Sequence, residues 1–70
     1  MISFEKFRVW YTKTYGKVVI KDIMSKTGLS RNTVDKIWND GVVSTKIINT
    51  ICSTYDIRVE DIMEYRKDGQ

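Results

Sequence analysis

The middle of the chain reads Ile20-Lys21-Asp22-Ile23-Met24-Ser25-Lys26-Thr27-Gly28-Leu29-Ser30-Arg31-Asn32-Thr33-Val34-Asp35-Lys36-Ile37-Trp38. Apolar residues recur at helical spacing on both sides of Gly28-Leu29-Ser30, so the segment contains two short amphipathic patterns joined by a tight turn. Glycine readily ends a helix in the left-handed conformation, and Ser30 is suited to cap the start of the next helix. The pattern is typical of a helix-turn-helix, in which one face of the second helix packs inward and the other stays free.

Helical patterns continue on both sides of this segment, and proline is absent. No part of the chain shows the alternation that predicts a strand. The expected helices run from a Ser3 cap, with Ile2 and Phe7 as a hydrophobic staple, to Tyr15-Gly16; from Ile20 to Thr27; from Ser30 to Asn39-Asp40-Gly41; from a Ser44 cap to Tyr55; and over Val59, Ile62 and Met63. Their short connections predict an all-α fold, a compact five-helix bundle.

The apolar positions of these patterns predict the core. We expect the first helix to bury Phe4, Phe7, Trp10 and Tyr11, the second Ile20, Ile23, Met24 and Thr27, the third Val34, Ile37 and Trp38, and the fourth Ile47, Ile48, Ile51, Cys52 and Tyr55. Cys52 is the only cysteine, so it cannot form an internal disulfide, and its place on an apolar face predicts a packing role.

Composition excludes several function classes. Seventy residues form one domain, and there is no histidine, no glycine-rich phosphate loop and no metal-ligand cluster. Serine, threonine and tyrosine are plentiful, but no histidine is available to act as their base. We therefore expect no enzyme activity, no catalytic residues, no metal, no cofactor and no small-molecule ligand.

Apolar runs are too short to span a membrane, and residues 1–6 lack the basic start and apolar stretch of a secretory signal. We therefore expect a cytoplasmic protein without a membrane partner.

Positive charge is concentrated in the first half of the chain. The net charge is +3 overall, but residues 1–36 carry +5 and residues 37–70 carry −2. The basic half contains the helix-turn-helix, and such a field attracts polyanions over about one Debye length, roughly 8 Å at physiological salt. A merely solvated basic surface is the alternative interpretation of the charge taken alone.

The free face of the helix beginning at Arg31 carries groups that read DNA. At 100° per residue, Asn32, Lys36 and Asn39 lie opposite Val34, Ile37 and Trp38, and Arg31 lies in the first turn. Arginine and lysine donate to guanine O6 and N7, and asparagine pairs with adenine N6 and N7. Asp35 on the flank can accept from a cytosine amino group or repel phosphate. The alternative is that these residues only solvate an exposed helix.

From Met1 to about Tyr65 the chain resembles Cro/C1-type helix-turn-helix regulators, whose domain is a five-helix, lambda-repressor-like bundle. The matching residues are Ile23, Gly28-Leu29-Ser30, Arg31-Asn32-Thr33-Val34, Ile37, Gly41, Val43-Ser44, Ile51-Cys52 and Val59-Glu60-Asp61-Ile62. The resemblance implies one DNA-binding domain over residues 1–65, followed by a polar tail at 66–70. Val18 to Ile23 followed by Gly-Leu-Ser also resembles the headpiece of LacI-type repressors, but a full apolar helix precedes it here.

In that family the first, second and sixth residues of the recognition helix touch base edges, which implies Arg31, Asn32 and Lys36 as base contacts. The expected contacts to the DNA backbone are Lys17, Lys21, Ser30, Thr33, Asn39, Ser44, Thr45 and Lys46. Val19 and Arg58 stand where the family commonly has a capping serine or threonine, so the second and fifth helices start less firmly.

The resemblance implies a sequence-specific transcriptional regulator that binds double-stranded DNA, most simply a repressor of phage or mobile-element type occupying an operator. A lone helix-turn-helix contacts few base pairs, so we expect a homodimer on a pseudo-palindromic site. The alternative is a protein-interaction module, such as an antirepressor or an antitoxin-like partner, that keeps the fold without reading DNA.

Overall fold

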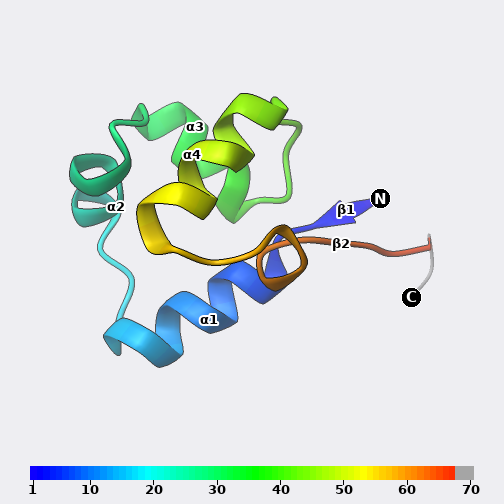
Figure 1. Ribbon diagram of the computed structural model, residues 1–70, viewed down its shortest axis with the longest axis horizontal. Helices are drawn as coiled ribbons and strands as arrows, with labels where there is room; N and C mark the ends of the chain where they lie inside the picture. The colour runs from blue at the N-terminus through cyan, green and yellow to red at the C-terminus, as the bar shows by residue number, and fades with distance from the viewer. Residues whose placement is uncertain (68–70) are drawn as a thin grey trace.

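Helices dominate the structure, a computed structural model that describes residues 1–67 (Figure 1). The elements follow in the order β1 (Ile2–Ser3), α1 (Glu5–Tyr15), α2 (Ile20–Thr27), α3 (Arg31–Trp38), α4 (Thr45–Tyr55), the 3₁₀ turn η1 (Val59–Asp61) and β2 (Glu64–Tyr65). The mostly helical architecture was predicted. Residues 68–70 of the predicted tail lie outside the described residues.

Local capping signals place the C-terminal ends of α1 and α2 and the starts of α3 and α4 where the sequence predicts them. Gly16 and Gly28 end α1 and α2 with positive φ angles of 81° and 75°. The Oγ of Ser30 accepts from the Thr33 backbone N–H, and the Oγ of Ser44 accepts from that of Ile47. Val19 supplies no side-chain cap to α2, as expected from its type. The two helices of the helix-turn-helix therefore have the predicted bounds.

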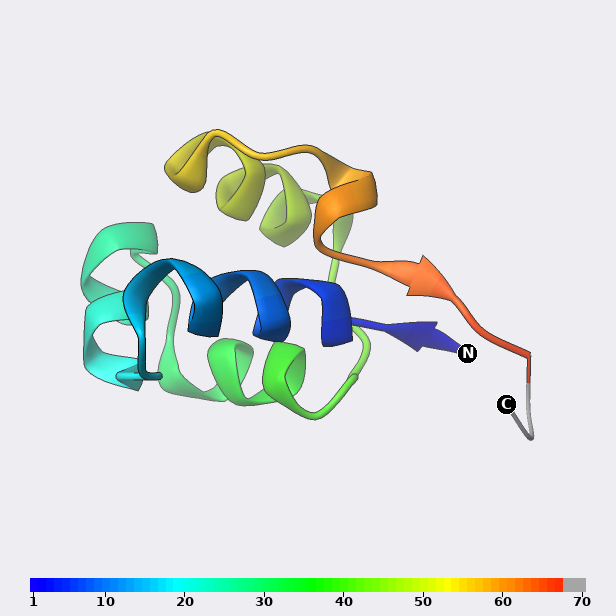
Figure 2. The same cartoon turned by 90° about the horizontal axis from the view of Figure 1, so that it is seen from below.

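The hydrophobic core lies between α1, α3 and α4, and in Figure 2 α1 runs between the other two helices. Phe7 of α1 shows why, because its ring centroid is 5.7 Å from that of Trp38 on α3 and 6.0 Å from that of Tyr55 on α4. The buried hydrophobic residues are Phe4, Phe7, Tyr11, Ile23, Val34, Ile37, Ile48, Ile51 and Ile62. All of them except Ile62 belong to the first four predicted helical patterns, and Cys52 packs half-buried against them.

The prediction of a fifth helix is wrong. Residues 59–61 form a single 3₁₀ turn, in which the carboxylate of Asp61 accepts from the Arg58 backbone N–H at 3.2 Å. Val59, which the predicted fifth helix contained, is 50% exposed, whereas Ile62 is fully buried. Burial of Ile62 fixes the end of the turn, and the next residues pair with another strand, so the chain cannot continue as a helix.

A short strand pair was not predicted. Ile2 pairs with Tyr65 and Ser3 with Glu64 in an antiparallel ribbon that projects from the helices at one end (Figure 1). Two-residue strands are too short to show a period of two, and their partners are far apart in sequence. Arg66 continues the contact by donating its backbone N–H to the Met1 carbonyl at 2.8 Å.

The ribbon also shifts the start of the first helix. Ser3 was predicted as its cap, but α1 begins at Glu5 with Phe4 in the capping position and no side-chain cap. Ser3 belongs to β1, and its Oγ accepts from the Glu5 N–H at 3.2 Å. Ile2, predicted as a staple, lies in the strand and is 41% exposed. Strand pairing takes precedence over the local cap because it engages the backbone at these two positions.

The hydroxyl of Tyr55 is buried among aromatic rings without a hydrogen-bond partner in residues 1–67. We expect Tyr55→Phe to raise the free energy of unfolding by about 1 kcal/mol, since it removes a polar group that unfolding returns to water. In urea titrations, Tyr65→Phe on the exposed ribbon serves as the control and is expected to change nothing. A loss of stability in Tyr55→Phe would contradict the unpaired state of this hydroxyl.

Burial raises the pKa of Tyr55 to about 12, above the ordinary value of 10.0. Between pH 10 and pH 12 the folded state thus keeps the hydroxyl protonated while the unfolded state loses the proton. The free energy of unfolding of the wild type therefore falls as the pH rises over this interval. Tyr55→Phe should lose less stability over that interval in the same titrations.

No helix within residues 1–67 is long and apolar enough to cross a membrane.

Candidate nucleic-acid interface

One face of helix α3 packs against the core, and the opposite face is exposed. Val34 and Ile37 on its inner face are each 1% exposed, and Gly28 and the Ser30 cap set its start close behind α2. Of the pairs of helices, α2 and α3 make the most extensive contact. The sequence folds this way because a left-handed glycine and a serine cap stand two residues apart, with the apolar Leu29 between them.

The front of α3 carries the predicted base-contacting residues. Arg31, Asn32 and Lys36 are all exposed, so no other part of residues 1–67 covers them. Four side chains at helical spacing, with Gly41 beyond the helix end, line one shallow hollow of about 370 Å³. They are Asn32, Asp35, Lys36 and Asn39. The structure therefore brings two of the three predicted base contacts into one stripe and adds Asp35 to it.

Two contacts involve residues of this stripe. Arg31 Nε lies 4.0 Å from Asp35 Oδ2, one helical turn away. The side-chain amide of Asn39 donates to the Asp35 carbonyl at 2.8 Å, which closes the last turn of the helix. The side-chain amide of Asn39 thus uses one of its N–H groups to close the end of the helix.

The predicted contacts to the DNA backbone lie at helix starts and connections. Lys17 is in the connection between α1 and α2, Lys21 in the first turn of α2, and Thr45 and Lys46 in the first turn of α4. All are exposed, as are Ser30, Asn39 and Ser44; Thr33 is half-buried, and its hydroxyl lies 3.0 Å from that of Ser30. Backbone N–H groups and positive dipole ends at helix starts favour phosphate.

A sequence model described as a Cro/C1-type HTH DNA-binding domain matches residues 16–68. The match covers most of the chain and includes the whole helix-turn-helix. The chain belongs to this family. No curated protein and no solved structure matches it. The matched segment of this Cro/C1-type domain begins after α1, although α1 supplies Phe7 and Tyr11 to the core.

In the Cro/C1-type domain, an ion pair that the sequence did not reveal holds the far end of α3. Asp40, just after α3, adopts a positive φ of 57°, and its Oδ1 accepts from Arg8 Nη1 and from the Phe4 backbone N–H, both at 2.7 Å. Arg8 Nη1 also donates to the Trp38 carbonyl at 3.1 Å. The hydrogen bond from Arg8, with that from Phe4, holds the pKa of Asp40 below its usual value. We name Arg8 and Asp40 the α1–α3 clamp.

The signal for this clamp was present but ambiguous. Aspartate tolerates the left-handed conformation, so Asp40 in Asn39-Asp40-Gly41 was interpreted as a helix terminator. Its partner Arg8 is 32 residues away, and nothing local marks the two as a pair.

Lys26 of α2 and Tyr15 of α1 contact each other beside the helix-turn-helix. Lys26 Nζ lies 4.3 Å from the centroid of the Tyr15 ring, a cation–π distance. The Tyr15 ring lies 4.7 Å from that of Tyr11. This pair joins the end of α1 to the end of α2.

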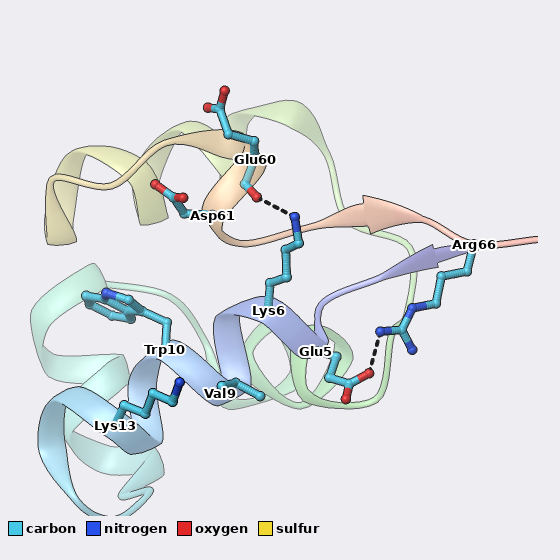
Figure 3. Close-up of a pocket in the computed structure, with 8 residues that line it drawn as sticks. All are labelled: Glu5, Lys6, Val9, Trp10, Lys13, Glu60, Asp61 and Arg66. Atoms are coloured by element: carbon cyan, nitrogen blue, oxygen red, sulfur yellow. Dashed lines mark hydrogen bonds and ion pairs between the residues drawn. The ribbon is translucent and has the colours of Figure 1, made fainter. Parts of the chain in front are cut away.

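Another hollow, of about 420 Å³, lies between α1 and η1 (Figure 3). The charges that line it are balanced, with the cations Lys6, Lys13 and Arg66 and the carboxylates Glu5, Glu60 and Asp61. Lys6 Nζ donates to the Glu60 carbonyl at 3.1 Å, and Arg66 pairs with Glu5 at 2.6 Å. Without a net positive charge, this groove does not favour a polyanion, in contrast to α3 and its basic flanks.

Proposed function

We propose that this Cro/C1-type domain is a sequence-specific transcriptional regulator, a repressor of phage or mobile-element type that occupies an operator in double-stranded DNA. The observation that carries the proposal is the exposed polar face of α3, whose opposite face is 1% exposed at Val34 and Ile37. A helix held this way keeps its reading side chains in register when it enters the major groove.

In this proposal Arg31, Asn32 and Lys36 contact base edges. Arg31 and Lys36 donate to guanine, and the amide of Asn32 pairs with adenine. The contacts to phosphates come from Lys17, Lys21, Ser30, Thr33, Asn39, Ser44, Thr45 and Lys46. The phosphate contacts position the domain on the duplex, while Arg31, Asn32 and Lys36 determine which base sequence is bound.

Two copies act together. The eight residues of α3 extend about 12 Å, which reaches only a few base pairs. A homodimer on a pseudo-palindromic operator, with half-sites about 34 Å apart, reads enough sequence for a specific site.

Titration against a random-sequence duplex at two salt concentrations tests the DNA-binding part of the proposal. We expect binding that weakens steeply with salt, because each phosphate contact releases counterions. Selection of bound sites from a random duplex pool should then yield a symmetric motif. Absence of salt-sensitive binding would reject the proposal in favour of a protein-interaction module with the same fold.

The variant Lys21→Ala tests the phosphate contacts. We expect it to weaken binding to all duplexes alike and to lower the slope of log K against log salt by about one unit. Lys13→Ala is the matched control, since Lys13 is an exposed lysine in the charge-balanced groove between α1 and η1. An equal slope for Lys21→Ala and the wild type would rule out a phosphate contact at Lys21.

A further inference from the structure

The exposed stripe on α3 contains the carboxylate of Asp35, although the proposed ligand, DNA, is a polyanion. Asp35 lines the same hollow as Asn32, Lys36 and Asn39, and its side chain is 49% exposed. It is the acidic residue of an eight-residue helix whose other charges are Arg31 and Lys36. A negative charge at this place repels phosphate, so it lowers affinity for DNA of any sequence.

The position of Asp35 relative to Arg31 gives Asp35 a role that offsets this loss of affinity for DNA. Its Oδ2 lies 4.0 Å from Nε, which is the side of the guanidinium nearest the chain. A carboxylate at Nε leaves the two Nη groups free at the far end of the planar fork. That free end has the spacing that a guanine O6 and N7 pair requires.

The pair is weak in water. Both side chains are well exposed, at 74% and 49%, and exposed ion pairs contribute little to stability. Its effect is therefore expected on recognition, where water is excluded and the orientation of Arg31 matters, rather than on folding.

We propose that Asp35 is a specificity-determining residue, which restrains Arg31 so that its Nη groups address a guanine in each half-site and which penalises contacts with phosphate. The inference rests on the proposed function, since it concerns the same face of α3. It makes Asp35 a positioning residue that increases selectivity at the expense of total affinity.

The test compares four proteins on duplexes that differ only at the base pair read by Arg31: wild type, Asp35→Ala, Arg31→Ala and the double variant. In the wild type we expect guanine to be preferred by about tenfold or more, as for a bidentate arginine contact. Asp35→Ala should reduce this preference to about threefold and raise affinity for random duplex about threefold. In the Arg31→Ala background, Asp35→Ala should leave the base preference unchanged, because the coupling partner is gone.

Two controls separate this role from general effects. Glu60→Ala removes an exposed carboxylate from η1, away from α3, and should leave the guanine preference intact. Thermal unfolding should show Asp35→Ala to be as stable as the wild type, since the Arg31 pair is exposed.

The outcomes are distinct. A guanine preference that survives Asp35→Ala overturns the role of Asp35 while the proposed function stands. A loss of preference that is the same with and without Arg31 also overturns it. If the wild type binds no duplex at all, both the proposed function and the inference built on it are rejected.

Discussion

Asn32→Ala and Lys36→Ala are each expected to weaken binding to the selected operator by about 1–3 kcal/mol, which is a loss of roughly 5- to 150-fold. Binding to random duplex should change little, because phosphate contacts supply that affinity. Both side chains are exposed and line the hollow on α3, so truncation removes the proposed base contacts without disturbing the core. Fluorescence anisotropy with the two duplexes measures both quantities.

Matched controls lie on other helices. Asn49→Ala removes an exposed asparagine from α4, and Lys13→Ala removes an exposed lysine from α1. Both should bind the operator nearly as the wild type does. If Asn32→Ala or Lys36→Ala loses affinity equally for operator and random duplex, the residue does not read bases.

Asp40→Ala is expected to lower the free energy of unfolding by about 2–3 kcal/mol. The substitution removes the acceptor of two 2.7 Å hydrogen bonds, from Arg8 and from the Phe4 N–H, and leaves a partly buried guanidinium without its carboxylate. In a 70-residue domain, whose core supplies roughly 3–5 kcal/mol, this is a large share of the stability. Urea unfolding measures the change directly.

The control for this variant is Asp56→Ala. Asp56 also has a positive φ, 53°, but it is exposed at the end of α4, so this variant reports the cost of alanine in the left-handed conformation alone. Equal losses in Asp40→Ala and Asp56→Ala would show that the α1–α3 clamp contributes nothing.

The clamp also predicts a dependence on acid. The pKa of Asp40 is lowered in the folded protein, so its contribution is complete above the ordinary value of 3.8 and disappears as the pH falls through the lower folded value. Asp40→Asn, which retains an acceptor oxygen, should be less sensitive to acid than the wild type below about pH 4.

Elements set by neighbouring residues could be predicted. Gly28 and Ser30 fix the turn between α2 and α3, and the period of Val34 and Ile37 fixes which face of α3 is inside. The exposure of Asn32 and Lys36 follows from the same period. These features depend on contacts three or four residues apart, which the sequence displays directly.

Elements that depend on residues far apart in the sequence could not be predicted. The segment after Arg58 has the apolar spacing of a helix, but its backbone beyond Ile62 pairs with β1 at the other end of the chain. The pairing of Arg8 with Asp40 likewise joins α1 to the end of α3. In both cases, no local sequence pattern near one partner indicates the other.

The sequence by itself therefore determined the helix-turn-helix, its caps and its polar outer face, because short-range backbone and packing preferences suffice for them. Tertiary structure alone decided the β1–β2 ribbon, the loss of the fifth helix and the clamp that anchors α3. These depend on free energies of contact between segments more than 30 residues apart, which arise only when the folded chain brings those segments together.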